Sequence, residues 1–219
     1  FDQARKLTTQ GTPQSVDNFY SPDEKLLSFF GRLNYDLFNK YLFTATFRAD
    51  ASSKFLGDNR WGYFPSAAVA WKVSEEGFLN NADWLDALEF RVSYGQAGNE
   101  NIPVGQTIQN FVSNNSTWIN GVDSYWAAST ILANPELKWE TTITRNIGLD
   151  FGLFNNRVSG SFEVYKNTTE DLLMRFPVPG TGYDFQYRNM GETQNQGIEA
   201  SLNLAILEKE NYGLNLSLN

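Results

Sequence analysis

The sequence predicts an all-β protein built as a meander of antiparallel hairpins. Apolar and polar residues alternate along several segments, as in residues 158–165, VSGSFEVY. Successive side chains of an extended chain point to opposite sides of a sheet, so this alternation gives a strand two different faces. Short turns join neighbouring segments of this kind, as in residues 154–157, FNNR, and such turns indicate hairpins. The sequence contains no run of about 18 apolar residues, which argues against a transmembrane helix.

The first 50 residues predict a loop followed by a hairpin. Residues 1–25 are polar and contain Gly11 and Pro13, which are typical of a loop. From residue 26 onward, apolar positions such as Phe43 and Phe47 alternate with polar ones such as Thr44. A turn is expected at residues 38–40, where Asn and Lys interrupt the alternation.

The middle of the chain predicts two further strands separated by a different element. Residues 65–76 and 88–99 alternate with period two, whereas the apolar residues between them do not. Phe78, Trp84 and Leu88 fit the spacing of a short helix, which Asn81 or Asp83 could cap. We therefore expect a short helix between these two strands.

The last third of the chain predicts a second long hairpin and two closing strands. Residues 138–167 form the hairpin, with its turn at residues 154–157, and residues 197–207 and 212–219 form the final strands. Residues 26–219 are thus expected to form one β unit.

The connections between the predicted strands differ in length at the two ends. Those at one end are short, at residues 38–40, 154–157 and 208–211; those at the other end are long, at about 51–63, 95–136 and 167–196. Aromatic residues gather near the short turns: Phe38, Tyr41, Phe78, Trp84 and Phe154. Outer-membrane barrels combine this asymmetry with aromatic girdles. A soluble sandwich with uneven loops remains open, because an apolar strand face can contact either lipid or a core.

Composition removes several classes of function. The formal net charge is -8, with 25 acidic and 17 basic residues, which argues against nucleic acid as a partner. The chain has no cysteine and no histidine, so thiolate chemistry, the commonest metal ligand and the commonest general base are absent. We expect no enzyme activity, no cofactor and no metal.

The acidic clusters of the chain raise one catalytic alternative, a glycoside hydrolase. Glu75 with Glu76, and Asp83 with Asp86 and Glu89, are the closest groups of carboxylates. A glycoside hydrolase needs two carboxylates across a cleft, and no such pair can be located. Helix capping and solvent exposure explain these residues better.

Two further sets of residues are candidates for function. Polar residues scattered over several strands share the face opposite the apolar one and could line a wet lumen: Arg32, Asn34, Arg48, Asp50, Glu89, Arg91, Glu163 and Glu199. Their alternative is a solvated strand face. The loop SNNSTWINGVDSYW carries Trp118, Tyr125 and Trp126, which could stack on a sugar or peptide or pack against a neighbouring loop or partner.

Several blocks resemble the barrel of SusC/RagA-type TonB-dependent outer-membrane transporters. They include SFFGRLNYDLFNKYLFTATFRADASSKF, NRWGYFPSAAVAWKVSEEGFL, WLDALEFRVSYGQAGN, NPELKWETTITRNIGLDFGLFNNRVSGSFEVYKNTTEDLLM and GIEASLNL. The resemblance implies part of a plugged transmembrane barrel of about 22 strands in the outer membrane of a Gram-negative bacterium. It also implies TonB-dependent import of an oligosaccharide or peptide, with a SusD-like surface lipoprotein as lid.

The resemblance also implies a plug domain and a TonB box, and neither is recognisable in these residues. We therefore expect a partial barrel with two open sheet edges, which reaches TonB through parts outside this sequence. The alternative function is a soluble all-β carbohydrate-binding module that uses the loop aromatics. The two differ in one respect: the apolar face that includes Phe29, Phe43 and Ile147 contacts lipid in the first and forms a core in the second.

Overall fold

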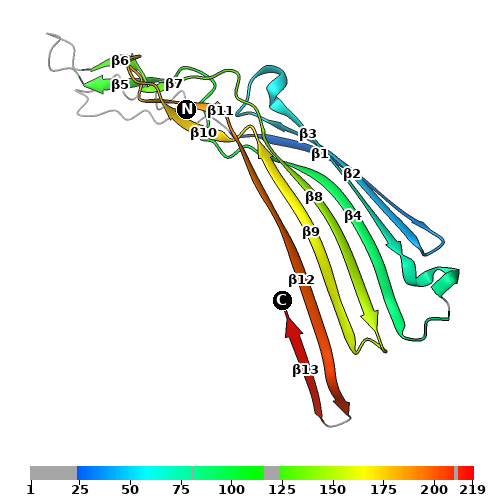
Figure 1. Ribbon diagram of the computed structural model, residues 1–219. Helices are drawn as coiled ribbons and strands as arrows, with labels where there is room; N and C mark the ends of the chain where they lie inside the picture. Colours follow the sequence, from blue (N-terminus) through cyan, green and yellow to red (C-terminus); the bar gives the residue numbers. More distant parts are fainter. Residues whose placement is uncertain (1–23, 80, 116–123, 210–211) are drawn as a thin grey trace.

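The computed structural model describes residues 24–79, 81–115, 124–209 and 212–219. Its main element is an eight-stranded antiparallel sheet of order β1-β2-β3-β4-β8-β9-β12-β13 (Figure 1). The strands of this sheet are β1 (Leu26–Leu37), β2 (Tyr41–Ser52), β3 (Trp61–Lys72), β4 (Leu85–Asn99), β8 (Glu140–Leu153), β9 (Val158–Glu170), β12 (Glu192–Lys209) and β13 (Tyr212–Leu218). The prediction of an all-β meander of hairpins is confirmed.

The short turns adopt the left-handed backbone that tight hairpins require. Phe38 and Asn39 both have a φ of 56° between β1 and β2, and Lys40 N donates to Leu37 O at 3.1 Å. Two successive residues with positive φ match the right-handed twist of the flanking strands. The β8–β9 turn has positive φ at Phe154, Asn155 and Asn156, and Arg157 N donates to Phe154 O at 3.4 Å. Both turns lie where the sequence predicts them, and the expected turn at 208–211 includes two residues outside the described ranges.

The short turns step progressively along the sheet. In the pairing register, the β1–β2 turn follows the pair Leu37 and Tyr41, which is level with Leu149 of β8, while β8 and β9 continue four positions further, to Leu153 and Val158. The β12–β13 hairpin extends further again (Figure 1). Such a stagger arises when strands tilt relative to the axis of a barrel. The sheet therefore has the geometry of a barrel wall rather than that of a flat layer.

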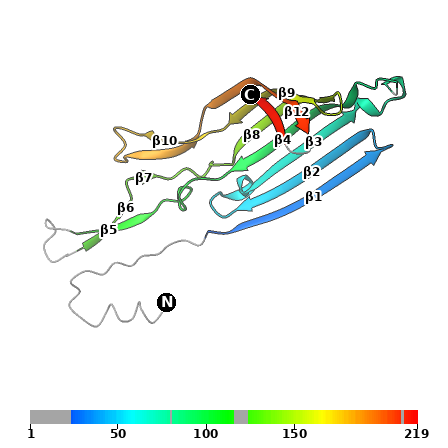
Figure 2. The same ribbon diagram turned by 90° about the horizontal axis from the view of Figure 1, so that it is seen from below.

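Two smaller sheets and most of the irregular chain lie beyond the other end of the main strands (Figure 2). One pairs β5 (Phe111–Asn115) with β6 (Ser124–Ala128). The other contains β10 (Leu173–Pro177), β11 (Phe185–Asn189) and β7 (Ile131–Leu132). The β4–β8 and β9–β12 connections are thus long at this end.

The predicted loop boundaries were wrong in detail. β2 extends to Ser52, β4 to Asn99 and β9 to Glu170, and β12 begins at Glu192. Parts of the predicted loops 51–63, 95–136 and 167–196 are therefore strand. β1 begins at Leu26, whereas the loop predicted for residues 1–25 lies mostly outside the described residues.

The predicted helix between the third and fourth strands does not form. The chain makes 3-10 turns at η2 (Val73–Glu75) and η3 (Gly77–Leu79), and β4 begins at Leu85. The last residues of the presumed helix are thus paired with β8, which leaves too few residues for a helix. Another short 3-10 turn, η1 (Gly57–Arg60), links β2 to β3. No helix in the described residues has the length and hydropathy needed to cross a membrane.

Candidate functional site: the two faces of the sheet

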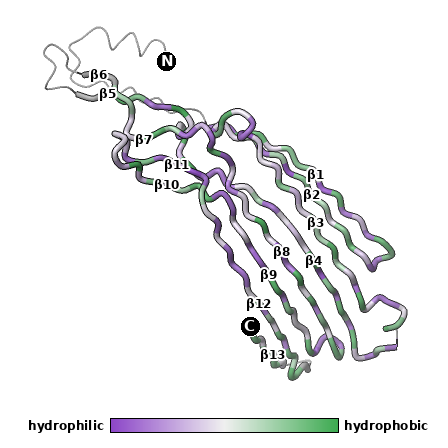
Figure 3. Tube along the Cα trace, turned by 45° about the horizontal axis from the view of Figure 1, so that its top comes forward, coloured by the Kyte–Doolittle hydropathy of each residue, from purple (hydrophilic) through white to green (hydrophobic). Residues whose placement is uncertain are grey.

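The face predicted to be apolar forms a continuous exposed band across the sheet. One row of directly paired residues runs through seven neighbouring strands, and every member is apolar and 40–68% exposed: Tyr35, Phe43, Val69, Val92, Ile147, Val164 and Ile198. Figure 3 shows the resulting alternation of hydrophobic and hydrophilic positions along these strands. A soluble sandwich would bury this row as its core, so the structure does not support the soluble alternative.

Aromatic side chains mark both ends of the apolar band. Phe38, Phe78, Trp84 and Phe154 are exposed near the short turns, as the sequence predicts. At the other end, Phe29 stacks on Trp61 with ring centroids 6.4 Å apart, and Trp61 stacks on Tyr63 at the same distance. This second group was not predicted, because Trp61 and Tyr63 lie in the segment 51–63 that the sequence assigned to a loop. Two aromatic girdles that flank an apolar band are typical of outer-membrane barrels.

A polar network joins three strands on the opposite face. The Arg91 guanidinium on β4 donates to Asp150 on β8 and, through Nη2 at 2.8 Å, to Oε1 of Glu163 on β9. Asn146 Nδ2 donates to the other Glu163 oxygen at 3.2 Å. Charge-assisted hydrogen bonds of this kind are stronger than neutral ones. The network therefore fixes the polar face across β4, β8 and β9, and it brings Arg91 and Glu163 of the predicted set together.

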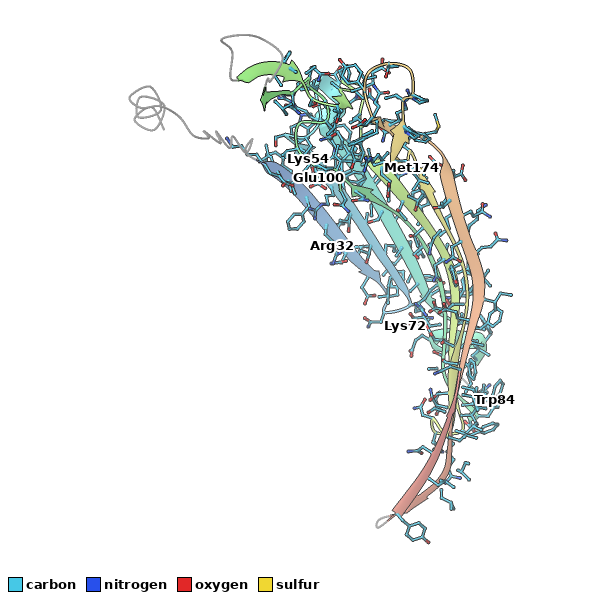
Figure 4. The ribbon with its side chains drawn as sticks, turned by 90° about the vertical axis from the view of Figure 1, so that its left-hand side faces the viewer. Arg32, Lys54, Lys72, Trp84, Glu100 and Met174 are labelled. Atoms are coloured by element: carbon cyan, nitrogen blue, oxygen red, sulfur yellow. The ribbon has the colours of Figure 1, made fainter. Side chains whose placement is uncertain are left out.

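The remaining predicted polar residues form smaller groups on the same face. Arg32 Nε donates to Thr46 at 3.1 Å, and Thr44 donates to Asn34 Oδ1 at 3.0 Å. Arg48 Nε donates to Asp50 Oδ2 at 2.6 Å. Figure 4 places Arg32 and Lys72 on the concave side of the curved sheet and Trp84 on the convex side.

Glu89 and Glu199, the two other glutamates of the predicted set, take no part in these hydrogen bonds. Glu89 pairs in register with Lys72 and Asp150, and Glu199 pairs with Glu163. These two residues thus share the polar face but contribute no hydrogen bond to the network. Whether this face lines a lumen remains a prediction.

A small hydrophobic core stabilises the end with the long connections. It contains Phe55, Phe64, Ile102, Leu137 and Trp139, all nearly or fully buried. The Trp139 indole donates to Arg60 O at 2.9 Å, which satisfies its polar atom. Gly62 and Gly98 leave room for the Phe64 ring, since a Cβ at either glycine would collide with it. This core was not predicted, because Phe55 and Ile102 lie in segments that the sequence assigned to loops and the five residues are far apart along the chain.

Glu76 organises the short-turn end, whereas the sequence predicts a helix cap or a solvated residue at this position. Its carboxylate accepts hydrogen bonds from Tyr41 OH at 2.6 Å, Trp71 Nε1 at 3.1 Å and Lys40 Nζ at 3.2 Å. These hydrogen bonds, led by that from Tyr41, hold the pKa of Glu76 below its ordinary value. Glu76 therefore ties the β3–β4 connection to the neighbouring hairpin through aromatic residues that stack at 6.3 Å.

The predicted substrate aromatics are only partly described. Trp118 lies outside the described residues, while the backbone of Tyr125 and Trp126 belongs to β6 and pairs with Asn114 and Ser113 of β5. Their contact with a ligand or partner stays a prediction. Among the described residues, no group of three or more acidic side chains could hold a metal ion.

Comparison with known proteins places these features in a family. The model of the TonB dependent receptor-like β-barrel matches residues 1–219. The TonB-dependent receptor SusC of Bacteroides thetaiotaomicron is 41% identical over 205 residues, which cover 91% of this chain and 20% of that protein. TonB-dependent receptor P26 of Formosa agariphila is 40% identical over 189 residues, covering 86% of this chain and 19% of that protein. The chain thus spans about a fifth of the length of these relatives.

Solved structures agree with this comparison. A structure of the RagAB peptide transporter superposes with a TM-score of 0.79 at 32% identity, over 89% of this chain and 21% of that chain. The ferric enterobactin receptor PfeA from Pseudomonas aeruginosa shares the fold, with a TM-score of 0.60 at 15% identity over 90% of this chain and 27% of that chain.

Proposed function

Because the chain belongs to the TonB-dependent receptor β-barrel family and is of the SusC/RagA type, we propose that it forms part of the wall of an outer-membrane nutrient transporter. The observation that carries this proposal is the exposed apolar row across seven strands, opposite a polar hydrogen-bonded face. The apolar face contacts lipid, and the polar face lines the lumen and positions the plug. The protein is located in the outer membrane of a Gram-negative bacterium.

The transported substrate is an oligosaccharide or a peptide, and import depends on TonB. The long connections receive the substrate and a SusD-like surface lipoprotein that acts as lid. Peptide is supported by the likeness to a structure named as a peptide transporter. The loop aromatics Trp118, Tyr125 and Trp126 contact the substrate or the lid, since aromatic side chains in polar loops suit stacking on either.

Cysteine labelling tests the membrane arrangement directly, because the chain contains no native cysteine. Asp58→Cys places a thiol at the end with long connections, and Asn81→Cys places one at the short-turn end. A membrane-impermeant maleimide added to intact cells should label the first and should label the second only after the outer membrane is permeabilised. Equal labelling of both in intact cells would contradict the proposal.

An uptake assay tests the transport function separately. Cells that carry the complete protein should accumulate a fluorescent oligosaccharide or peptide, and a TonB deletion should abolish this. Trp118→Ala and Trp126→Ala should lower uptake of the correct substrate without changing the cysteine-labelling pattern. A correctly inserted protein with TonB-independent uptake would refute the energised mechanism while leaving the barrel intact.

A further inference from the structure

A groove crosses the outward face where the apolar band ends on strands β4, β8, β9 and β12. Its volume is about 730 Å³. One side consists of four apolar residues that are register neighbours in the exposed row: Val92, Ile147, Val164 and Ile198. An apolar floor of this kind, open to the exterior of the barrel wall, suits an acyl chain.

The opposite side of the groove carries two adjacent positive charges. Arg145 on β8 pairs directly with Lys166 on β9, and both side chains are exposed. Directly opposite residues of an antiparallel pair have Cβ atoms about 5 Å apart, and like charges at such positions are destabilising. Arg145 lies over the Tyr94 ring at 5.9 Å. In the described part of the chain, neither cation forms an ion pair with a carboxylate.

The two cations lie at the edge of the exposed apolar positions of β8 and β9, since the next outward residues towards the long connections, Ile143 and Thr168, are buried. Towards the short turns, the next outward positions on both strands are apolar, at Ile147 and Val164 and then at Leu149 and Phe162. Uncompensated cations at the edge of a lipid-facing band attract the anionic headgroups of the bilayer. A free anion would gain nothing from the apolar floor.

We propose that this groove binds a phosphate-bearing membrane lipid. The phosphate contacts Arg145 and Lys166, and an acyl chain lies along the four apolar residues of the floor. The proposal rests on the proposed membrane location, since it requires this face to contact lipid. It assigns a ligand site to the outside of the barrel wall, away from the substrate path.

Native mass spectrometry of the complete, detergent-purified protein tests this site. We expect titration with dioleoylphosphatidylglycerol to give one saturable bound lipid that Arg145→Gln with Lys166→Gln weakens by about 30-fold, from about 1 kcal/mol for each cation near an anionic lipid surface. Lys72→Gln is the matched control, because it removes one positive charge from the polar face. This control should bind lipid as the unchanged protein does.

Two further ligands distinguish the contribution of the charged headgroup from that of the acyl chain. Inorganic phosphate should not displace the lipid at concentrations comparable to it, and dioleoylphosphatidylcholine should bind more weakly because its headgroup has no net charge. Equal lipid occupancy in the double variant and the unchanged protein would overturn the proposal, as would full displacement by phosphate. The labelling of Asp58→Cys and Asn81→Cys reports membrane insertion independently, so loss of the lipid site and loss of the proposed function are distinguishable.

Discussion

An arginine placed on the outward face of β3 should destabilise the protein far more than one placed next to it on the inward face. The perturbation is Ala67→Arg, with Ser66→Arg as its matched control. Ala67 is exposed on the outward face of β3, whereas Ser66 is half-buried on the other. The two substitutions add the same side chain at neighbouring positions of one strand.

The magnitude follows from the depth of Ala67 in the apolar band. The outward positions of β3 run from Trp61 to Trp71, which spans about 33 Å at about 3.3 Å per residue. A strand tilt of about 40° reduces this to about 25 Å, the height of a barrel's lipid-facing band. Ala67 lies near the middle of that span. An outward arginine at this position should lower the free energy of unfolding by about 2–4 kcal/mol.

The inward arginine should cost much less, because Ser66 borders an open hollow of about 250 Å³ on the polar face. The assay is equilibrium unfolding of the complete protein by urea in phosphatidylcholine vesicles, followed by the change in electrophoretic mobility of the folded barrel. Equal costs at the two positions would refute the assignment of faces, and a larger cost for Ser66→Arg would reverse it.

The same unfolding assay checks three further predictions. Arg91→Leu leaves its two carboxylate partners without a counter-ion and should lower the free energy of unfolding by about 1–2 kcal/mol. This value lies between those of exposed and buried ion pairs because the Arg91 side chain is 38% exposed. Arg91→Lys should recover part of the loss. Gly98→Ala should lower the free energy of unfolding by about 1–3 kcal/mol, because the added methyl group collides with the Phe64 ring. Gly31→Ala is the control, since open space surrounds Gly31, and it should leave the stability unchanged or slightly raise it. The lowered pKa of Glu76 means that its stabilisation is complete above its ordinary value of 4.5 and is lost as the pH falls through the depressed value. Glu76→Gln should therefore lower the urea midpoint at neutral pH and have little effect at strongly acidic pH, while an equal effect of Glu75→Gln at neutral pH would contradict this assignment.

Much of the sheet could be predicted because its information is local. Two-residue alternation fixes which side chains share a face, as for Phe162 and Val164 against Glu163, and a one-residue slip would exchange the faces. Turn residues such as Asn155 locate the hairpins. The strands of the main sheet, their apolar and polar faces and the hairpin turns could therefore be predicted, whereas the strands of the two smaller sheets could not.

The errors occurred where distant contacts override local preference. The residues 95–99, GQAGN, have weak strand propensity, yet β4 continues through them because β8 supplies a full hydrogen-bonding partner. The core around Trp139 joins segments about 80 residues apart, so no local pattern indicates it. Glu76 was misread for the same reason: its partners Lys40 and Tyr41 belong to another hairpin.

The exposure of the two faces argues most strongly for the environment of this sheet. In a soluble protein, apolar faces lie inside and polar faces outside, whereas here the convex face is apolar and exposed and the concave face is polar and partly covered. The same arrangement of faces is repeated from one strand to the next, and the hairpin turns are staggered as expected for strands that tilt relative to a barrel axis. An apolar solvent outside the curve and water within it would favour both faces at once. The proposed bilayer on the convex side would therefore give the sequence pattern, the register and the shape of the sheet one physical cause.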